Sequence, residues 1–306
     1  MNRLKIMDNK IAIEYRKKLP KSNNFNIREL REMPQYFGWV NYVINEKNEV
    51  DLFLGGNDDG VALRCFWNNH YEKKTLEIWA KLSVVEGIIL DIGAHSGIYS
   101  LVANKSIQKG AVLSFEPHYL NFSRLNLNLR ANSISTKSIF MNAVGAKNET
   151  LPFSVNQDSN YLTSGGKIGK FKNKTSTSIK VLAIDNILDV TAKKNVKIIK
   201  IDVEGHEYEC LLGMKQTLIE SHPIIFFECM SLSNNSEIEI FLNELEYTIF
   251  SIDDWEGTIK ETKFLYPIFD NNNNIIHQKI NRLAAHKTKI DLLNQILTYT
   301  LNFGLI

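Results

Sequence analysis

The 306-residue sequence lacks several features that would assign it to a specialised class. Its three cysteines, Cys65, Cys210 and Cys229, form no CxxC pair, which is typical of reduced thiols rather than of disulfides or a zinc site. The 36 basic and 34 acidic side chains nearly cancel, so there is no electrostatic case for nucleic-acid binding. No run approaches the roughly 18 apolar residues of a membrane helix, and residues 1–20 lack the apolar core of a signal peptide. We therefore expect a cytoplasmic protein without a membrane span.

What the sequence does contain is a strand, a glycine turn and a helix between residues 87 and 102. The apolar run from Ile88 to Ile92, interrupted by Asp91, predicts a strand buried on both faces of a parallel sheet. Gly93 and Gly97 frame the turn, and the apolar pattern after them predicts the helix. Glycines let the backbone approach a ligand closely, and the free N–H groups of the helix point to the same place. Taken alone, such a turn is weak evidence for a ligand.

The rest of the chain alternates between strand and helix patterns. This alternation predicts a right-handed parallel α/β sheet that binds ligands at the carboxyl ends of its strands. Further strands of this domain are expected at residues 111–115, 138–144, 179–184, 196–203 and 223–227. The last two strands are expected to pair with each other, at residues 247–252 and 263–269.

The two ends of the chain show different patterns. Strand-like pieces at residues 38–44, 50–54 and 61–66 predict a small β-rich extension, a region suited to substrate or subunit contacts. From residue 286 onward the pattern predicts an amphipathic helix, for which packing on its own domain is favoured over a homo-oligomer contact. The expected organisation is an extension (1–70), a main domain (71–270) and a C-terminal helix (271–306).

Three acidic residues follow predicted core strands: Asp91, Glu116 and Asp202. Glu116 comes one βαβ step after Asp91, and an acid about 20 residues past a glycine turn accepts hydrogen bonds from ribose hydroxyls. The alternative is an acid that is simply favoured by the dipole of the following helix. The turn is G-x-x-x-G and lacks the third glycine of an NAD site. The pattern therefore favours a nucleoside without a pyrophosphate and disfavours a nicotinamide oxidoreductase.

Five blocks resemble the FkbM-type S-adenosylmethionine-dependent methyltransferases in order and spacing: DIGAHSGIYSL, FEPHYLNFSRLNLNLRAN, NAVG, IDVEGHEYECLLG and PIIFFE. The resemblance covers roughly residues 75–252. It implies a class I methyltransferase fold, which is a Rossmann-like, mostly parallel seven-stranded sheet with an antiparallel last strand. It also implies S-adenosylmethionine as cofactor and a hydroxyl acceptor, commonly on a sugar of a surface polysaccharide or on a small secondary metabolite.

The resemblance also assigns cofactor contacts to residues of this chain. It implies that the methionine part is held at the turn by Asp91, Gly93, Ala94, His95 and Gly97. It also implies that Glu116 binds the ribose, that Asn142 and Ala143 form the adenine edge, and that Asp202 lies near the sulfonium. Family members often carry Asn at the position of His95, so this contact is less well defined than the others.

The candidate bases are Asp202, Glu204 and His206. An alcohol is a poor nucleophile at neutral pH, so a group that removes its proton assists the reaction. The three residues alternate, and alternating residues of an extended backbone share one face. His206 has the suitable intrinsic pKa, whereas the resemblance favours the two acids. Their ligand types also suit a metal ion, but we expect no metal site.

Other polar residues belong to the same predicted region. His95, His118 and Glu228 are candidate substrate contacts, and Tyr161 and Ser164 lie in a long loop of the kind that often forms a lid. A plain surface role is the alternative for each of them. A catalytically idle cofactor-binding partner protein is the alternative to an enzyme. The sequence does not name the acceptor.

Overall fold

The computed structural model describes residues 9–20, 23–46, 48–155, 161–162, 165–172, 174–230, 235–271, 273 and 275–302, the last five of these by their backbone only. Its centre is an eight-stranded sheet with the order β13-β12-β14-β11-β10-β3-β4-β5. The strands are β3 (Glu86–Ile92), β4 (Lys109–Phe115), β5 (Ile139–Phe140), β10 (Val196–Ile201), β11 (Ile224–Glu228), β12 (Tyr247–Asp253), β13 (Thr258–Glu261) and β14 (Asn281–His286). Strands β5, β4, β3, β10 and β11 are parallel, and β14 runs antiparallel to both β11 and β12.

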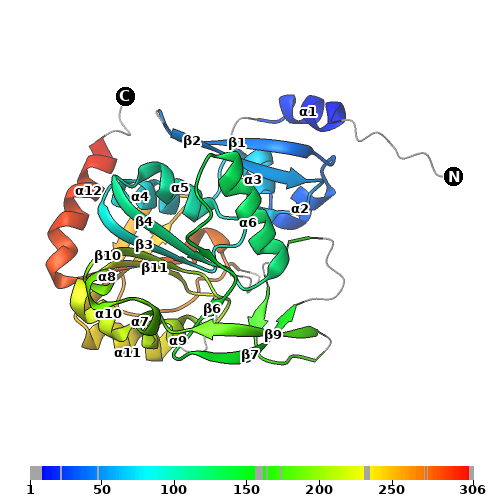
Figure 1. Cartoon of the computed structure of the whole chain (residues 1–306). Coiled ribbons are helices and arrows are strands. Elements are labelled where there is room, and N and C mark those ends of the chain that lie inside the picture. Colours follow the sequence, from blue (N-terminus) through cyan, green and yellow to red (C-terminus); the bar gives the residue numbers. More distant parts are fainter. Residues whose placement is uncertain are drawn as a thin grey trace.

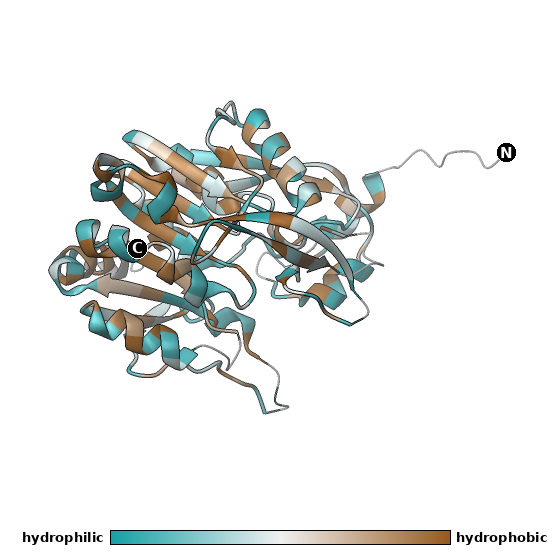
Figure 2. Ribbon diagram, turned by 60° about the horizontal axis from the view of Figure 1, so that its bottom comes forward, coloured by the Kyte–Doolittle hydropathy of each residue, from teal (hydrophilic) through white to brown (hydrophobic). Residues whose placement is uncertain are grey.

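Helices cover both faces of this sheet (Figure 1). One face carries α4 (Lys73–Leu82), α5 (Ile98–Ser106), α6 (Tyr119–Ala131) and α12 (Ile290–Asn302). The other face carries α7 (Ile184–Ile187), α8 (Val190–Lys194), α9 (Glu207–Leu212), α10 (Lys215–Ser221) and α11 (Asn235–Glu244). Neighbouring strand residues such as Ile198 and Ile199 belong to opposite cores, which explains why apolar residues predominate in the central strands (Figure 2).

The α/β class and the antiparallel strand are as expected, but the strand count is not. An eighth strand, β13, pairs with β12 at the edge of the sheet. The expected last strand at 263–269 is wrong, because the strand that pairs with β12 on its inner side is β14. The polar residues Asn281, Arg282 and His286 are buried in β14 and hid it from the hydrophobic pattern. The sheet therefore includes residues beyond 270.

The N-terminal extension contains a hairpin and three helices: α1 (Lys10–Lys17), α2 (Ile27–Glu32), β1 (Phe37–Asn45), β2 (Asn48–Gly55) and α3 (Gly60–Asn68). The strand expected at 61–66 is wrong, since this segment belongs to α3, which is capped by Asp59. The amide side chains of Asn128 and Asn132 on α6 accept hydrogen bonds from the backbone N–H groups of Phe53 and Asp51 in β2. The extension is thus held against α6, the helix that follows Glu116.

A second, four-stranded sheet lies beyond the carboxyl ends of the central strands (Figure 1). Its order is β6-β9-β7-β8, formed by β6 (Ala143–Val144), β7 (Glu149–Val155), β8 (Lys167–Ile168) and β9 (Thr175–Leu182). The single strand expected at 138–144 is instead divided between the two sheets, as β5 and β6. No helix of the described residues is long and apolar enough to cross a membrane.

Two stacked imidazoles at the amino edge of the sheet give a pH prediction. The rings of His222 and His286 lie 3.6 Å apart, and burial lowers the pKa of both below 6.5, with Lys287 and Lys289 adding to the effect and Glu246 opposing it. A histidine whose pKa is lowered by folding stabilises the protein above about pH 6.5 and loses that contribution as the pH falls.

We therefore expect the urea midpoint of the parent to fall more between pH 7.5 and 5.5 than that of His222→Phe, which keeps an aromatic ring at this position. Urea unfolding followed by circular dichroism at both pH values measures the difference. Equal falls in the two proteins would contradict the role of this pair.

Candidate functional site at the carboxyl edge of the sheet

The glycine turn after β3 packs directly against the loop after β10. Gly93 has φ +83°, and a Cβ atom there would lie 1.8 Å from the carbonyl oxygen of Asp202. Gly97 has φ +98° and begins α5, where a Cβ atom would lie 2.5 Å from a methyl group of Leu125. Both positions therefore require glycine for packing. The close packing at Gly93 brings the backbone of Asp202 against the turn.

Asp91 lies beneath this turn and points into the protein. It is 1% exposed and accepts a hydrogen bond of 2.5 Å from Ser100 Oγ, which in turn lies 2.6 Å from Ser114 Oγ. Burial raises the pKa of Asp91 to about 6. In this structure Asp91 fixes the first turn of α5, and its contact with the methionine part of the cofactor stays a prediction.

Glu116 lies at the carboxyl end of β4 between two histidines. It is 5% exposed and accepts hydrogen bonds from the backbone N–H groups of His95 (2.9 Å) and His118 (2.8 Å) and from Asn121 Nδ2 (3.4 Å). Burial raises the pKa of Glu116. His95 Nε2 and His118 Nδ1 are buried and have no hydrogen-bond partner among the described residues. A buried acceptor with two polar nitrogens left over suits a ligand that carries hydroxyl groups.

The next two predicted cofactor residues lie where the chain leaves the central sheet. Asn142 follows β5, and its Nδ2 donates to the carbonyl of Lys180 at 3.4 Å. Ala143 is buried in β6, where it pairs with Val181. Phe153 of β7 lies 6.3 Å from the His118 ring, measured between ring centroids, so the second sheet lies next to the histidine that follows Glu116. The adenine-edge assignment stays a prediction.

The premise that placed Asp202, Glu204 and His206 on one face is wrong. Glu204 and Gly205 have φ +57° and +100°, so the backbone turns instead of continuing as a strand. The imidazole of His206 lies 3.6 Å from the carboxylate of Glu209 and packs against Gly145, and burial lowers its pKa. Burial and the neighbouring charge of Asp202 raise the pKa of Glu204 to about 7.

Sequence reasoning missed a buried lysine at the centre of this edge. Lys200 of β10 is 1% exposed, and its Nζ lies 3.9 Å from Asp202 Oδ2 and 3.8 Å from Glu228 Oε1. Both carboxyl groups thus lie near the same ammonium, and the pKa of each is raised, chiefly by burial. The sequence did indicate this residue, because a lysine inside the apolar run VKIIKIDV is unusual in a strand that is buried on both faces.

The N-terminal side of the chain completes this acidic region. The Lys200 ammonium lies 5.0 Å from the centroid of the Tyr99 ring, and the Tyr99 hydroxyl donates a hydrogen bond to the Glu72 carboxylate. No group of three His, Cys, Asp or Glu with metal-site geometry occurs within the part of the chain that the structure describes.

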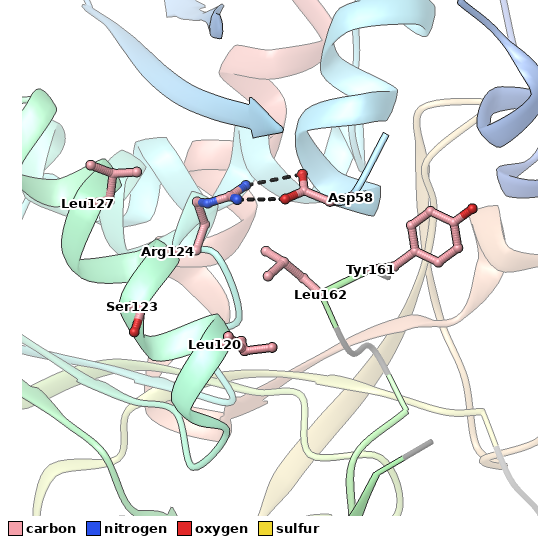
Figure 3. Close-up of a pocket in the computed structure, with 7 residues that line it drawn as sticks. All are labelled: Asp58, Leu120, Ser123, Arg124, Leu127, Tyr161 and Leu162. Atoms are coloured by element: carbon pink, nitrogen blue, oxygen red, sulfur yellow. Dashed lines mark hydrogen bonds and ion pairs between the residues drawn. The ribbon is translucent and has the colours of Figure 1, made fainter. Parts of the chain in front are cut away.

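A separate pocket of about 400 Å³ lies on the outer side of α6 (Figure 3). Its lining consists of Asp58, Leu120, Ser123, Arg124, Leu127, Tyr161 and Leu162. Its two charged groups satisfy each other, with Arg124 Nη2 and Asp58 Oδ2 2.7 Å apart. Tyr161 stacks under the guanidinium of Arg31 at 4.1 Å from its ring centroid; Ser164 lies outside the described residues. We therefore place the chemistry at the carboxyl edge, where the polar groups are not mutually satisfied.

The fold is of the α/β class, with polar residues gathered at the carboxyl ends of its parallel strands. Residues 91–264 match the family model described as the methyltransferase FkbM domain. Since this match covers more than half of the chain, the protein belongs to the FkbM methyltransferase family, as the sequence blocks indicated.

Two solved structures are similar to this chain at low sequence identity. The methyltransferase FkbM from Methylobacillus flagellatus KT is 16% identical, with 74% of this chain and 53% of that chain covered and a TM-score of 0.41. This chain thus spans about half the length of that protein. A SAM-dependent O-methyltransferase from Thermotoga maritima is 13% identical, with 71% and 66% covered and a TM-score of 0.37. The comparison with curated proteins finds no significant match.

Proposed function

We propose that this protein is an S-adenosylmethionine-dependent O-methyltransferase whose acceptor is a hydroxyl of a sugar, as in a precursor of a surface glycan. The observation that carries the proposal is Glu116, a buried acceptor at the end of β4 flanked by the unpartnered ring nitrogens of His95 and His118. This arrangement fits the ribose of a nucleoside cofactor. Membership of the methyltransferase family supports the choice of cofactor.

The residues around the glycine turn would hold the cofactor. The turn itself, Glu116 and the segment around Asn142 would contact its methionine, ribose and adenine parts, in the order that the family resemblance implies. When bound, S-adenosylmethionine supplies a methyl group that is already activated on a sulfonium. The protein then has to orient the acceptor oxygen and remove its proton. Asp202, whose backbone lies against the glycine turn, would be the base.

The first test is calorimetric titration of S-adenosylmethionine and S-adenosylhomocysteine into the parent and into Glu116→Ala. We expect micromolar-range binding by the parent and at least tenfold weaker binding by the variant, because one charge-assisted hydrogen bond is worth about 1.5–3 kcal/mol. Glu239→Ala is the matched control, since Glu239 accepts a backbone hydrogen bond from Leu265 outside the glycine-turn and ribose region.

Two outcomes would contradict the proposal. A folded parent that binds neither ligand would remove the cofactor assignment, and an NADH titration would then test the oxidoreductase alternative. Equal affinities of the parent and Glu116→Ala would show that the carboxylate does not contact the ribose.

A further inference from the structure

The ammonium group of Lys200 is buried at the carboxyl edge without a hydrogen bond. Its Nζ has no partner within hydrogen-bond distance among the described residues. Burial alone would lower the pKa of Lys200, but the charges of Asp202, Glu228, Glu72 and Asp91 raise it above the ordinary value, so the lysine is charged. An ammonium has three donors, and leaving them unused in the interior costs free energy. The arrangement is therefore built for a ligand that supplies an acceptor atom.

The distances from Lys200 to its two acidic neighbours indicate which kind of acceptor atom would fit beside it. The nearest oxygens of Asp202 and Glu228 are 3.9 and 3.8 Å from Nζ, which is too far for a direct hydrogen bond. One oxygen atom placed beside this gap could lie about 2.8 Å from the ammonium and from a carboxylate at once. A hydroxyl oxygen fits this position, because it accepts from the ammonium and donates to the carboxylate.

We propose that Lys200 and the neighbouring carboxyl groups of Asp202 and Glu228 bind the hydroxyl of the acceptor that receives the methyl group. The inference rests on the proposed function and assigns the acceptor side of the same site. As the acceptor oxygen forms its bond to the methyl carbon and the carbon–sulfur bond breaks, the hydroxyl proton passes to the Asp202 carboxylate. Lys200 stays protonated and stabilises the negative charge that develops on the oxygen.

The charge around Lys200 also restricts the class of acceptor. Four carboxyl groups, from Glu72, Asp91, Asp202 and Glu228, act on a single ammonium. Even with one proton shared between Asp202 and Glu228, the surroundings carry net negative charge. A phosphate or carboxylate next to the reacting hydroxyl would be repelled. The acceptor is therefore a neutral polyol or an amino sugar at this position.

The electrostatic test needs no acceptor, because S-adenosylmethionine carries a positive sulfonium and S-adenosylhomocysteine does not. The ratio of their dissociation constants reports the charge beside the transferred methyl group. Lys200→Met should shift this ratio in favour of S-adenosylmethionine at least threefold, because it removes a positive charge beside the sulfonium, and Lys200→Gln should shift it in the same direction. Lys193→Met is the matched control, since Lys193 of α8 is also buried but donates a hydrogen bond to Gln216 of α10. Its ratio of dissociation constants should match that of the parent.

Unchanged ratios in both site variants, with binding intact, would overturn this inference and leave the proposed function standing. A parent that binds neither ligand would overturn both. If Lys200→Met does not fold, as judged by its melting temperature and binding of S-adenosylhomocysteine, Lys200→Gln decides alone.

A second readout uses labelled methyl transfer to methyl glycosides. Methyl glucoside and methyl glucosaminide should be accepted in preference to methyl glucuronide, and Lys200→Met should lower kcat at least 100-fold. Preference for the glucuronide would overturn the charge argument. A parent that methylates none of the panel would contradict the sugar acceptor of the proposed function, and the binding ratios would still decide the role of Lys200.

Discussion

Gly93→Ala is expected to destabilise the protein by at least about 3 kcal/mol, because two costs add at this position. The added Cβ would lie 1.8 Å from the carbonyl oxygen of Asp202, a backbone atom that no side-chain movement can displace. The φ of +83° is also unfavourable for any residue with a Cβ. The loss should appear as a lower midpoint in urea unfolding monitored by circular dichroism.

Gly205→Ala is the matched control for this prediction. Gly205 has φ +100°, but a Cβ there would meet no atom within 4 Å. This variant carries only the conformational cost, about 1–2 kcal/mol. If both variants lose the same stability, the close approach of the two loops at Gly93 tolerates a methyl group, and the packing argument fails.

Asp202→Asn is expected to lower methyl transfer by a factor of about 10² to 10⁴, the usual contribution of a general base. An amide keeps the size of the side chain but cannot take up the hydroxyl proton. Affinity for S-adenosylhomocysteine should change little, since the product carries no sulfonium charge for the carboxylate to contact. Single-turnover transfer of labelled methyl groups to methyl glycosides measures the rate, and calorimetry measures the affinity.

The pH profile separates Asp202 from its neighbours. The base must be deprotonated, so the parent's kcat/KM should rise with pH through the pKa of that group and then level off. If Glu204 were the base, kcat/KM would rise around pH 7, because the pKa of Glu204 is raised to about 7. Glu204→Gln would then abolish this rise. We expect Glu204→Gln and His206→Asn to keep at least a tenth of the parent rate. Parent-like turnover by Asp202→Asn would show that another group is the base.

The sequence was sufficient for elements whose apolar residues follow one clear period. The strand before Gly93 and the helices that follow Gly97 and Glu116 lie where the pattern placed them. The pattern failed at residues 61–66, because a short run of mostly buried apolar residues, as in α3, is equally typical of a strand. It also failed at β14, because buried polar residues in that strand resemble those of a surface loop.

The sequence could predict which candidate residues lie at the carboxyl ends of the central strands. Asp91 lies near the carboxyl end of β3, and Glu116 and Asp202 come directly after β4 and β10. Since these strands are parallel neighbours, the topology alone brings the three residues to one edge of the sheet. The grouping of His206 with Asp202 was not predictable, since it assumed an extended backbone that Glu204 and Gly205 interrupt. Glu72 joins the site only through tertiary packing against Tyr99, a contact that no local pattern encodes.

The position of β14 has a consequence for synthesis on the ribosome. Residues 281–286 are made after β11, β12 and β13, yet their strand lies between β11 and β12 inside the sheet. Until they emerge, the nascent chain has two unpaired strand edges, which are prone to pair with other chains. Proteins truncated before residue 281 should therefore accumulate in inclusion bodies, and chaperones that shield exposed strands should matter most between the synthesis of β11 and that of β14.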